Sequence, residues 1–334
     1  MTLEKIAKKM CAKGKGILAA DESTGTMDKR LTSVGVECTD KNRLNFRETL
    51  FTADAMKNYI GGVILFDTTI REKTNAGISI PELIEKNNAV VGIKVDKGAK
   101  KLAGSSEETV TEGLDGLRER LSEYHKLGAR FTKWRAVYNI EKSCPSIQSM
   151  KSNAHALARY SALVQEAGMV PIVEPEVLME GDHDIDMCYK ATTEVLNECF
   201  NELIIQKVSM KGIVLKPNMV VPGFKSLKTV TPEEIAKKTL DCLKKNVPSD
   251  VPGIAFLSGG QSEQEATNNL DAINKINDTN FLITYSYGRA LQQSALKTWS
   301  KEMSNTKAIH DVFNHRAKMN GLASKGEWSQ ALEI

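Results

Sequence analysis

The chain lacks the features that would tie it to a membrane or to nucleic acid. No apolar run approaches the ~18 residues that a membrane-spanning helix needs, and residues 1–16 lack the apolar centre of a secretory signal. The formal net charge is only +3 over 334 residues, and neither sign is concentrated in one region. Such an even distribution of charge favours neither a nucleic acid nor a membrane surface as partner. We therefore expect a cytoplasmic protein, and a small or anionic substrate remains open.

Motifs for a bound metal or nucleotide are missing as well. None of the six cysteines belongs to a Cys-x-x-Cys pair, so we expect reduced thiols and no zinc site; they are Cys11, Cys38, Cys144, Cys188, Cys199 and Cys242. The Gly-x-Gly-x-x-Ala match at residues 14–19 enters an apolar segment instead of leaving one, which argues against a dinucleotide. Asp182 and Asp184 are typical of a helix N-terminus, and we expect His183 to be a surface or capping residue. No metal and no cofactor are expected.

Short apolar segments rich in β-branched residues recur along the chain with amphipathic stretches between them. There are eight, at residues 16–21, 60–66, 90–96, 130–138, 169–178, 212–220, 253–260 and 281–288. Crossover helices are predicted at 107–128, 146–168 and 231–246. This rhythm predicts a (β/α)8 TIM barrel, an α/β fold, as a single domain of residues 1–334. The barrel core covers about 14–300, with helical or irregular additions at 1–15 and 302–334.

Charged residues gather near the C-terminal ends of these segments, where barrel enzymes keep their active sites. They are Asp21, Lys94, Asp96, Lys133, Arg135, Glu174, Glu176, Lys216 and Arg289. Because side chains alternate along a strand, Lys133 and Arg135 point to one side, and Lys216 shares the inner face with Val214. A plug of compensating ion pairs is the alternative, but barrel interiors are ordinarily aliphatic and buried ion pairs are weak stabilisers. A converging site is the favoured interpretation.

A lysine at the barrel mouth points to one kind of chemistry. The amine of Lys216 can attack a carbonyl and form a Schiff base, which is an electron sink for making or breaking a C–C bond. Glu174 and Asp21 are candidates for moving the protons. Glycine-rich turns at 256–262 and 286–290 stand before predicted helices, a place where many barrels bind phosphate. A phosphorylated sugar would also explain Lys94, Lys133 and Arg135.

Blocks spread over residues 14 to 300 resemble class I fructose-bisphosphate aldolases, in the right order. They include "GKGILAADESTGTMDKRL", "VVGIKVDKG", "TKWRAV", "VPIVEPEVL", "LKPNMV", "FLSGGQSEQEA" and "YSYGRALQQSALKTW". The resemblance implies a cytoplasmic lyase of glycolysis and gluconeogenesis, usually a homotetramer that needs no metal. It implies cleavage of fructose 1,6-bisphosphate to dihydroxyacetone phosphate and glyceraldehyde 3-phosphate. Cytoskeletal partners are implied by the resemblance alone.

The resemblance also implies a role for individual residues. Lys216 would form the Schiff base, Glu174 with Glu176 beside it would serve as acid and base, Asp21 would deprotonate the C4 hydroxyl, and Lys133 would assist. Substrate contacts would come from Ser258, Gly259, Gly260, Ser286, Gly288 and Arg289 with Arg30 at one phosphate, and from Ser23, Thr26 and Lys94 at the other, with Arg135 nearby. Thr26 stands where relatives often have serine, which keeps the hydroxyl.

Two alternatives and one departure stay open at this point. The chain could be another Schiff-base barrel lyase, such as a transaldolase or a deoxyribose-phosphate aldolase, or a scaffold that keeps the fold without the activity. Family members typically carry a C-terminal tyrosine that helps exchange the enamine proton, whereas this sequence has no tyrosine after Tyr287. We therefore expect cleavage whose rate is limited by enamine protonation.

Overall fold

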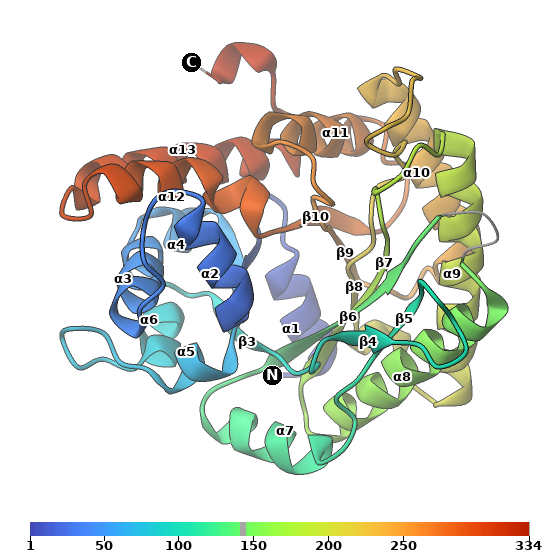
Figure 1. Cartoon of the computed structure of the whole chain (residues 1–334), viewed down its shortest axis with the longest axis horizontal. Coiled ribbons are helices and arrows are strands. Elements are labelled where there is room, and N and C mark those ends of the chain that lie inside the picture. The colour runs from blue at the N-terminus through green and yellow to red at the C-terminus, as the bar shows by residue number, and fades with distance from the viewer. Residues whose placement is uncertain (141–144, 334) are drawn as a thin grey trace.

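The computed structural model describes residues 1–140 and 145–333, and eight parallel strands close into a barrel (Figure 1). The strands are β1 (Gly16–Ala20), β2 (Ile60–Leu65), β3 (Val90–Lys94), β6 (Phe131–Tyr138), β7 (Val170–Val177), β8 (Val214–Leu215), β9 (Gly253–Phe256) and β10 (Leu282–Tyr287). Around the barrel they follow the order β1-β10-β9-β8-β7-β6-β3-β2. Each of the eight apolar segments supplies one strand, so the predicted (β/α)8 barrel is confirmed.

Helices surround the barrel and follow the strands along the chain (Figure 1). They are α2 (Thr24–Thr32), α3 (Asp40–Phe51), α4 (Ala55–Asn58), α5 (Asp67–Arg71), α6 (Ile80–Lys86), α7 (Leu117–Lys126), α8 (Ile147–Glu166), α9 (Ile185–Ile205), α10 (Pro232–Asn246), α11 (Glu263–Lys275) and α12 (Arg289–Lys301). Polar caps fix where they begin: Thr231 with Glu234, and Ser262 with Glu265, form capping boxes at α10 and α11. Within the described residues, no helix is both long enough and apolar enough to cross a bilayer.

The predicted helix over residues 107–128 is wrong in its first half. Strand β5 (Thr109–Thr111) pairs antiparallel with β4 (Ala99–Lys101), and α7 begins only at Leu117. Between β5 and α7, Gly113 and Gly116 have φ of +132° and +62°. A continuous α-helix cannot contain such positive φ values, whereas glycine adopts them without strain. The spacing of apolar residues before these glycines fits a three-residue strand as well as a helix, so it did not distinguish the two.

The predicted strand over residues 212–220 is also much shorter than expected. Only Val214–Leu215 is regular, after a 3₁₀ turn η1 (Met210–Gly212). Lys216 N still donates to Val173 O at 2.8 Å, but Pro217 has no N–H to extend the ladder. Asn218 then takes over, since its side-chain Oδ1 accepts from Val177 N at 3.0 Å. The chain therefore leaves the barrel wall directly after Lys216.

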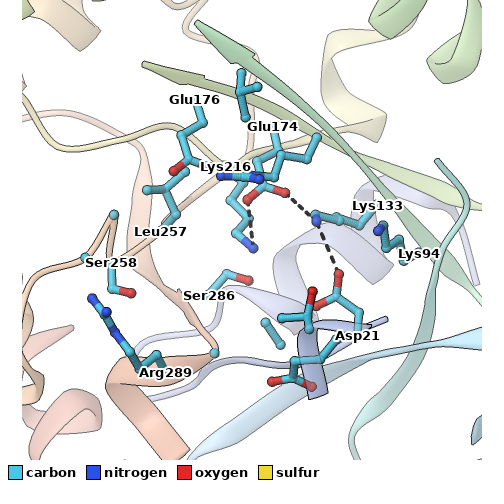
Figure 2. A pocket seen from close by; sticks show the side chains of 18 of the residues that line it. Asp21, Lys94, Lys133, Glu174, Glu176, Lys216, Leu257, Ser258, Ser286 and Arg289 are labelled. Carbon is cyan, nitrogen blue, oxygen red and sulfur yellow. Dashed lines mark hydrogen bonds and ion pairs between the residues drawn. The ribbon is translucent and has the colours of Figure 1, made fainter. Parts of the chain in front are cut away.

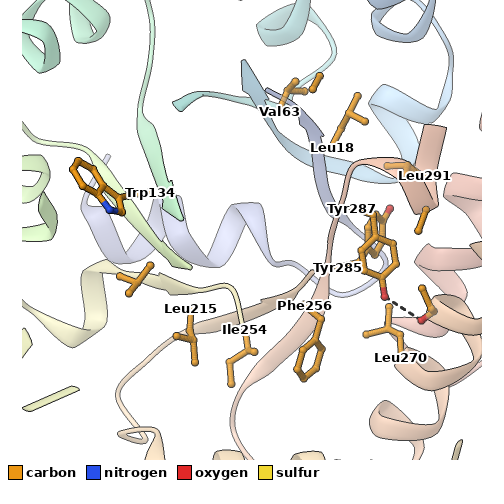
Figure 3. Close-up of a cluster of buried hydrophobic side chains, with 14 of the residues drawn as sticks. Leu18, Val63, Trp134, Leu215, Ile254, Phe256, Leu270, Tyr285, Tyr287 and Leu291 are labelled. Carbon is orange, nitrogen blue, oxygen red and sulfur yellow. Dashed lines mark hydrogen bonds between the residues drawn. The ribbon is translucent and has the colours of Figure 1, made fainter. Parts of the chain in front are cut away.

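The strands separate two apolar layers, as their alternation predicts. Val214 faces the barrel interior with Ile172, whereas Leu215 packs under the helices with Ile254 and Phe256. Figure 3 shows this outer layer around β8, β9 and β10. The inward direction predicted for Val214, and by parity for Lys216, is confirmed.

Phe131 fills the middle of the barrel interior and is fully buried. Two neighbouring strands must carry glycine there, since a Cβ at Gly92 would lie 2.2 Å from the Phe131 ring and one at Gly62 would lie 3.0 Å from it. Helix α1 (Leu3–Met10) places Ile6 and Met10 in the same apolar cluster. The N-terminal end of the barrel is thus sealed by apolar contacts.

The C-terminal segment is held against the outer helices. Helix α13 (Thr306–Ala323) carries Arg316, whose guanidinium binds the carboxylate of Glu333 beyond the 3₁₀ turn η2 (Gln330–Leu332). Trp328 donates from Nε1 to the same carboxylate at 2.9 Å. Helices α1 and α13 lie in the two terminal segments where helical or irregular additions were expected. Cys144 lies outside the described residues, and the other five cysteines are free thiols.

Replacing Phe131 with alanine is expected to lower the free energy of unfolding by about 3–5 kcal/mol, because a cavity opens where Gly62 and Gly92 leave no side chain to collapse into it. Phe131→Leu keeps most of the volume and is expected to cost clearly less. Urea denaturation of both variants measures the effect. Equal losses for the two variants would contradict the packing assigned to this ring.

Candidate active site

A cavity of 560 Å³ opens at the C-terminal mouth of the barrel. Every residue predicted for the site from the sequence lines it: Asp21, Ser23, Thr26, Arg30, Lys94, Lys133, Arg135, Glu174, Glu176, Lys216, Ser258, Gly259, Gly260, Ser286, Gly288 and Arg289. They come from strands and turns far apart in the sequence, and the barrel closure brings them together. None of the predicted residues lies elsewhere.

Adjacent strands place the charged side chains on the inner face. On β6, Lys133 and Arg135 alternate with Trp134, which is fully buried on the helix side. On β7, Glu174 and Glu176 alternate with Pro175. In the parallel register Arg135 lies opposite Glu174, and Lys94 lies opposite Lys133. The alternation predicted from the sequence is confirmed, and it directs both lysines into one space.

The centre of the cavity is a chain of alternating charges (Figure 2). Lys216 Nζ lies 3.1 Å from Glu174 Oε1, and Glu174 Oε2 lies 3.0 Å from Lys133 Nζ. Lys133 Nζ also donates to Asp21 Oδ2 at 3.2 Å. Lys216, Glu174 and Lys133 are almost completely buried. Each carboxylate therefore offsets an ammonium group that has lost most of its contact with water.

These contacts change how the groups ionise. Burial alone would raise the pKa of Asp21, but the ammonium groups of Lys133, Lys216 and Lys94 hold it at about 2. Burial likewise opposes ionisation of Glu174, and Lys133, Lys216 and Arg135 still lower its pKa. For Lys133, the carboxylates of Asp21 and Glu174 outweigh burial and raise the pKa. At neutral pH both acids are carboxylates, and Glu174 faces the amine of Lys216.

A second set of ion pairs lines the side of the cavity. Arg135 Nε binds Glu176 Oε2 at 2.5 Å, which, despite burial, raises the pKa of the guanidinium. Lys94 Nζ lies 3.4 Å from Asp96 Oδ1, and the other oxygen of Asp96 accepts from Arg135 N at 3.3 Å. Asp96 therefore joins β3 to β6 and limits how far Lys94 can move.

One end of the cavity is built to receive an anion. Gly259 and Gly260 have φ of +53° and +94° in the turn before α11, and α12 begins after Gly288 without a side-chain cap. Helix N-termini of this kind present free N–H groups and favour negative charge. Ser286 Oγ is buried and has no hydrogen-bond partner in the described part of the chain. The exposed Arg289 stands at the same end.

Helix α2 supplies groups to both sides of the cavity. At its N-terminus the hydroxyls of Ser23 and Thr26 lie 3.1 Å apart, and Lys94 lines the same cavity. Further along α2, Arg30 approaches Gly288, where a Cβ would lie 3.3 Å from its Nη2. Arg30 thus stands on the side of α12, as the resemblance implied, while Ser23 and Thr26 lie a turn or more away on the helix.

Sequence reasoning missed several groups at this mouth. Glu22 is buried and binds Arg30 Nη1 at 2.6 Å and Arg47 Nη2 at 3.5 Å. Its position beside Asp21 after a strand was the available signal. Phe224 and Glu180 also line the cavity, and as residues of irregular segments they carried no pattern that would have found them.

His183 is not the surface residue that the sequence suggested. It is 2% exposed, and neither ring nitrogen has a partner among residues 1–140 and 145–333. Burial lowers the pKa of this imidazole. The reason is a contact between distant segments, because Gly181 and Gly223 let two backbone segments close over the ring. Asp184 does cap α9 as expected, accepting from Asp186 N and Met187 N.

Comparison with known proteins decides the family. The sequence profile of the glycolytic class I fructose-bisphosphate aldolases matches residues 2–333. The chain belongs to this family. A probable class 1 fructose-bisphosphate aldolase of Xylella fastidiosa is 50% identical over 98% of both chains, and human fructose-bisphosphate aldolase C is 49% identical over 98% of this chain and 90% of its own.

Solved structures agree. A Plasmodium falciparum fructose-bisphosphate aldolase, crystallised with TRAP and a small-molecule inhibitor, superimposes with a TM-score of 0.96 at 42% identity, covering 98% of this chain and 95% of its own. The chain is therefore an enzyme, a carbon–carbon lyase of the class that acts on phosphorylated sugars through a lysine Schiff base. The aldolase prediction is confirmed, and the comparisons favour it over another Schiff-base lyase or an inactive scaffold.

The low pKa of Asp21 makes a prediction about acid stability. A carboxyl that ionises near pH 2 in the fold, and at 3.8 ordinarily, stabilises the fold above about pH 4 and loses this effect as the pH falls toward 2. At neutral pH we expect the free energy of unfolding of Asp21→Asn to be lower than that of the wild type by on the order of 2 kcal/mol. This difference should become smaller at about pH 3, where the wild-type carboxyl begins to lose its stabilising effect. Urea midpoints across this range measure it. A gap independent of pH would contradict the assignment.

Proposed function

We propose that Lys216 forms the Schiff base with C2 of fructose 1,6-bisphosphate. The observation that carries this assignment is the 3.1 Å contact between Lys216 Nζ and Glu174 Oε1 inside a cavity that has an anion-binding end. Transfer of a proton from Lys216 to Glu174 gives the neutral amine that attacks the carbonyl. Glu174 then returns that proton to the carbinolamine oxygen, which leaves as water and yields the iminium ion.

We assign cleavage of the C3–C4 bond to Asp21, which lies on the other side of Lys133 from Glu174. The C4 hydroxyl gives its proton to Asp21, the C3–C4 bond breaks, and its electron pair moves into the iminium to form an enamine. Asp21 is a weak base while Lys133 binds it, so we propose that the ammonium of Lys133 turns to the substrate oxygen as the proton moves. Glyceraldehyde 3-phosphate leaves first. Protonation of the enamine and addition of water then release dihydroxyacetone phosphate.

The two phosphates are assigned to the two ends of the cavity. One would bind at Ser258, Gly259, Gly260, Ser286, Gly288 and Arg289, with Arg30 beside them, and the other at Ser23, Thr26 and Lys94. The unpartnered hydroxyl of Ser286 and the uncapped start of α12 support the first assignment. Glu176 would hold Arg135 near the sugar rather than take part in proton transfer.

The domain organisation, oligomeric state and localisation are proposed from similarity to relatives. Residues 1–334 would act as one domain, a homotetramer would form, and the enzyme would work in the cytoplasm, as the name of the pea cytoplasmic isozyme, 49% identical, suggests. Cytoskeletal partners stay a prediction from the resemblance. Analytical ultracentrifugation distinguishes a tetramer from smaller species.

Borohydride trapping tests the role of Lys216. With fructose 1,6-bisphosphate and EDTA present, we expect reduction to fix a sugar phosphate covalently on the peptide that contains Lys216, because an iminium is reduced to a stable secondary amine. Peptide mass mapping locates the adduct, and Lys216→Met is the matched control that should carry none. An adduct on Lys133 or Lys94 instead, from folded and active protein, would refute the assignment.

Replacing Glu174 with glutamine tests its proton transfer. Because the amide keeps the size of the side chain but cannot accept the proton of Lys216, we expect kcat to fall by roughly 10²–10⁴-fold. Glu180→Gln changes an exposed carboxylate at the rim of the same cavity and is expected to keep most of the activity. Steady-state cleavage assays compare the two variants, and losses of similar size would sink the role given to Glu174.

A further inference from the structure

The segments that follow β7 and β8 are joined backbone to backbone at the cavity mouth. The hydrogen bonds run from Gly223 N to His183 O (2.9 Å), from Phe224 N to Met179 O (2.9 Å) and from Lys225 N to Gly181 O (2.8 Å). Strand β7 carries Glu174, and the chain leaves the barrel after β8 at Lys216. The position of Phe224 is therefore fixed relative to the two strands that bear the reacting pair.

Close packing beneath these bonds keeps the two segments together. A Cβ at Gly223 would lie 2.4 Å from Gly181 O and 3.0 Å from the His183 ring, so the approach requires glycine. His183 fills the space below as a buried ring. In an ordinary exposed loop the backbone could move and carry an aromatic side chain with it. Here the hydrogen bonds and the close packing restrict the backbone at Phe224.

The ring of Phe224 lies over the turn assigned to phosphate. A Cβ at Gly260 would lie 2.2 Å from Phe224 Cζ, so ring and turn are in direct contact. Phe224 is nevertheless 56% exposed, which is unusual for a phenylalanine, and it lines the catalytic cavity together with Ser258 and Gly259. The tip of the ring touches the turn at Gly260, and the rest of the ring borders the opening.

Phe224 also borders a second cavity, of 250 Å³, behind the turn. Its walls are largely apolar and include Met179, Val221, Val230 and Ile235. Since the same ring lines both spaces, it is a partition between them. Removing the ring would join this space to the phosphate end of the catalytic cavity.

We propose that Phe224 is a specificity-determining residue for the phosphate bound at residues 258–260, an inference that rests on the proposed function. The ring offers no hydrogen bond. Its tip excludes water from the part of the turn that it contacts at Gly260, and hydrogen bonds between backbone N–H groups and a phosphate strengthen when water is excluded. It also closes the way into the apolar cavity, so a phosphate ester with an apolar group pointing that way is rejected.

Phe224→Ala tests both effects. We expect KM for fructose 1,6-bisphosphate and the inhibition constant of inorganic phosphate to rise roughly five- to tenfold, with kcat changed less than about twofold, because only binding at the phosphate end is weakened. Phenyl phosphate should gain as an inhibitor relative to inorganic phosphate, since its ring can enter the apolar cavity. Phe224→Leu should restore most of the wild-type values, because it keeps an apolar cover.

Leu227→Ala is the matched control, since Leu227 is fully exposed on the same segment and does not line the catalytic cavity. Unchanged KM and phosphate inhibition in Phe224→Ala, or equal changes in Leu227→Ala, would overturn the proposal, and so would phenyl phosphate inhibition that falls in step with phosphate. Phe224→Ala should still form the borohydride adduct on Lys216 at saturating substrate. Lack of that adduct in the wild type would count against the proposed function instead.

Discussion

The contact of Glu174 with two lysine ammonium groups is the interaction on which the arrangement of the cavity depends. A carboxylate and two ammonium groups are held almost without water inside a barrel that is otherwise lined with apolar side chains. Desolvating such charges is costly, and only close contacts of opposite sign offset the cost. Asp21 supplies the fourth charge, which leaves Lys133 shared between two carboxylates. Loss of any one member would leave an uncompensated charge, so the four groups act as a unit.

Strand geometry, more than loop conformation, holds this unit in place. Lys133 and Glu174 stand on the neighbouring strands β6 and β7, and Lys216 follows β8, whose first residue pairs with β7. The brevity of β8 does not loosen Lys216, because its N–H still bonds Val173 and Asn218 continues the contact through its side chain. Sites supported by strands keep their geometry better than sites on loops. Phe131 and α1 fill the barrel below, so the strands have little room to shift.

The sequence predicted what depends on local pattern. Eight apolar segments and the parity along them were enough to place Lys216 and Glu174 on one face, and the polar ends of the segments located the cavity. Two of the three failures depend on contacts between residues far apart in the sequence. The β4–β5 hairpin forms where glycines interrupt an apolar period, the end of β8 is decided by Pro217 and by the side chain of Asn218, and His183 is buried because two glycines meet above it. The partners of Asn218 and of His183 lie outside any local window of sequence, whereas the hairpin falls within residues 99–111 and is followed by the glycines that end the apolar period.

The two ends of the cavity differ in how far their polar groups are satisfied, and this difference has a physical meaning. At the amine end each charge already has a partner of opposite sign, since Glu174 lies between Lys216 and Lys133. At the anion end Ser286 Oγ is unpartnered within the described residues and α12 is uncapped, a cost that a bound phosphate would relieve. Under the proposed assignment, binding free energy therefore comes from the phosphate end and positions the carbonyl. Under the same assignment, Lys216 at the amine end gives up its ion pair with Glu174 when it forms the Schiff base.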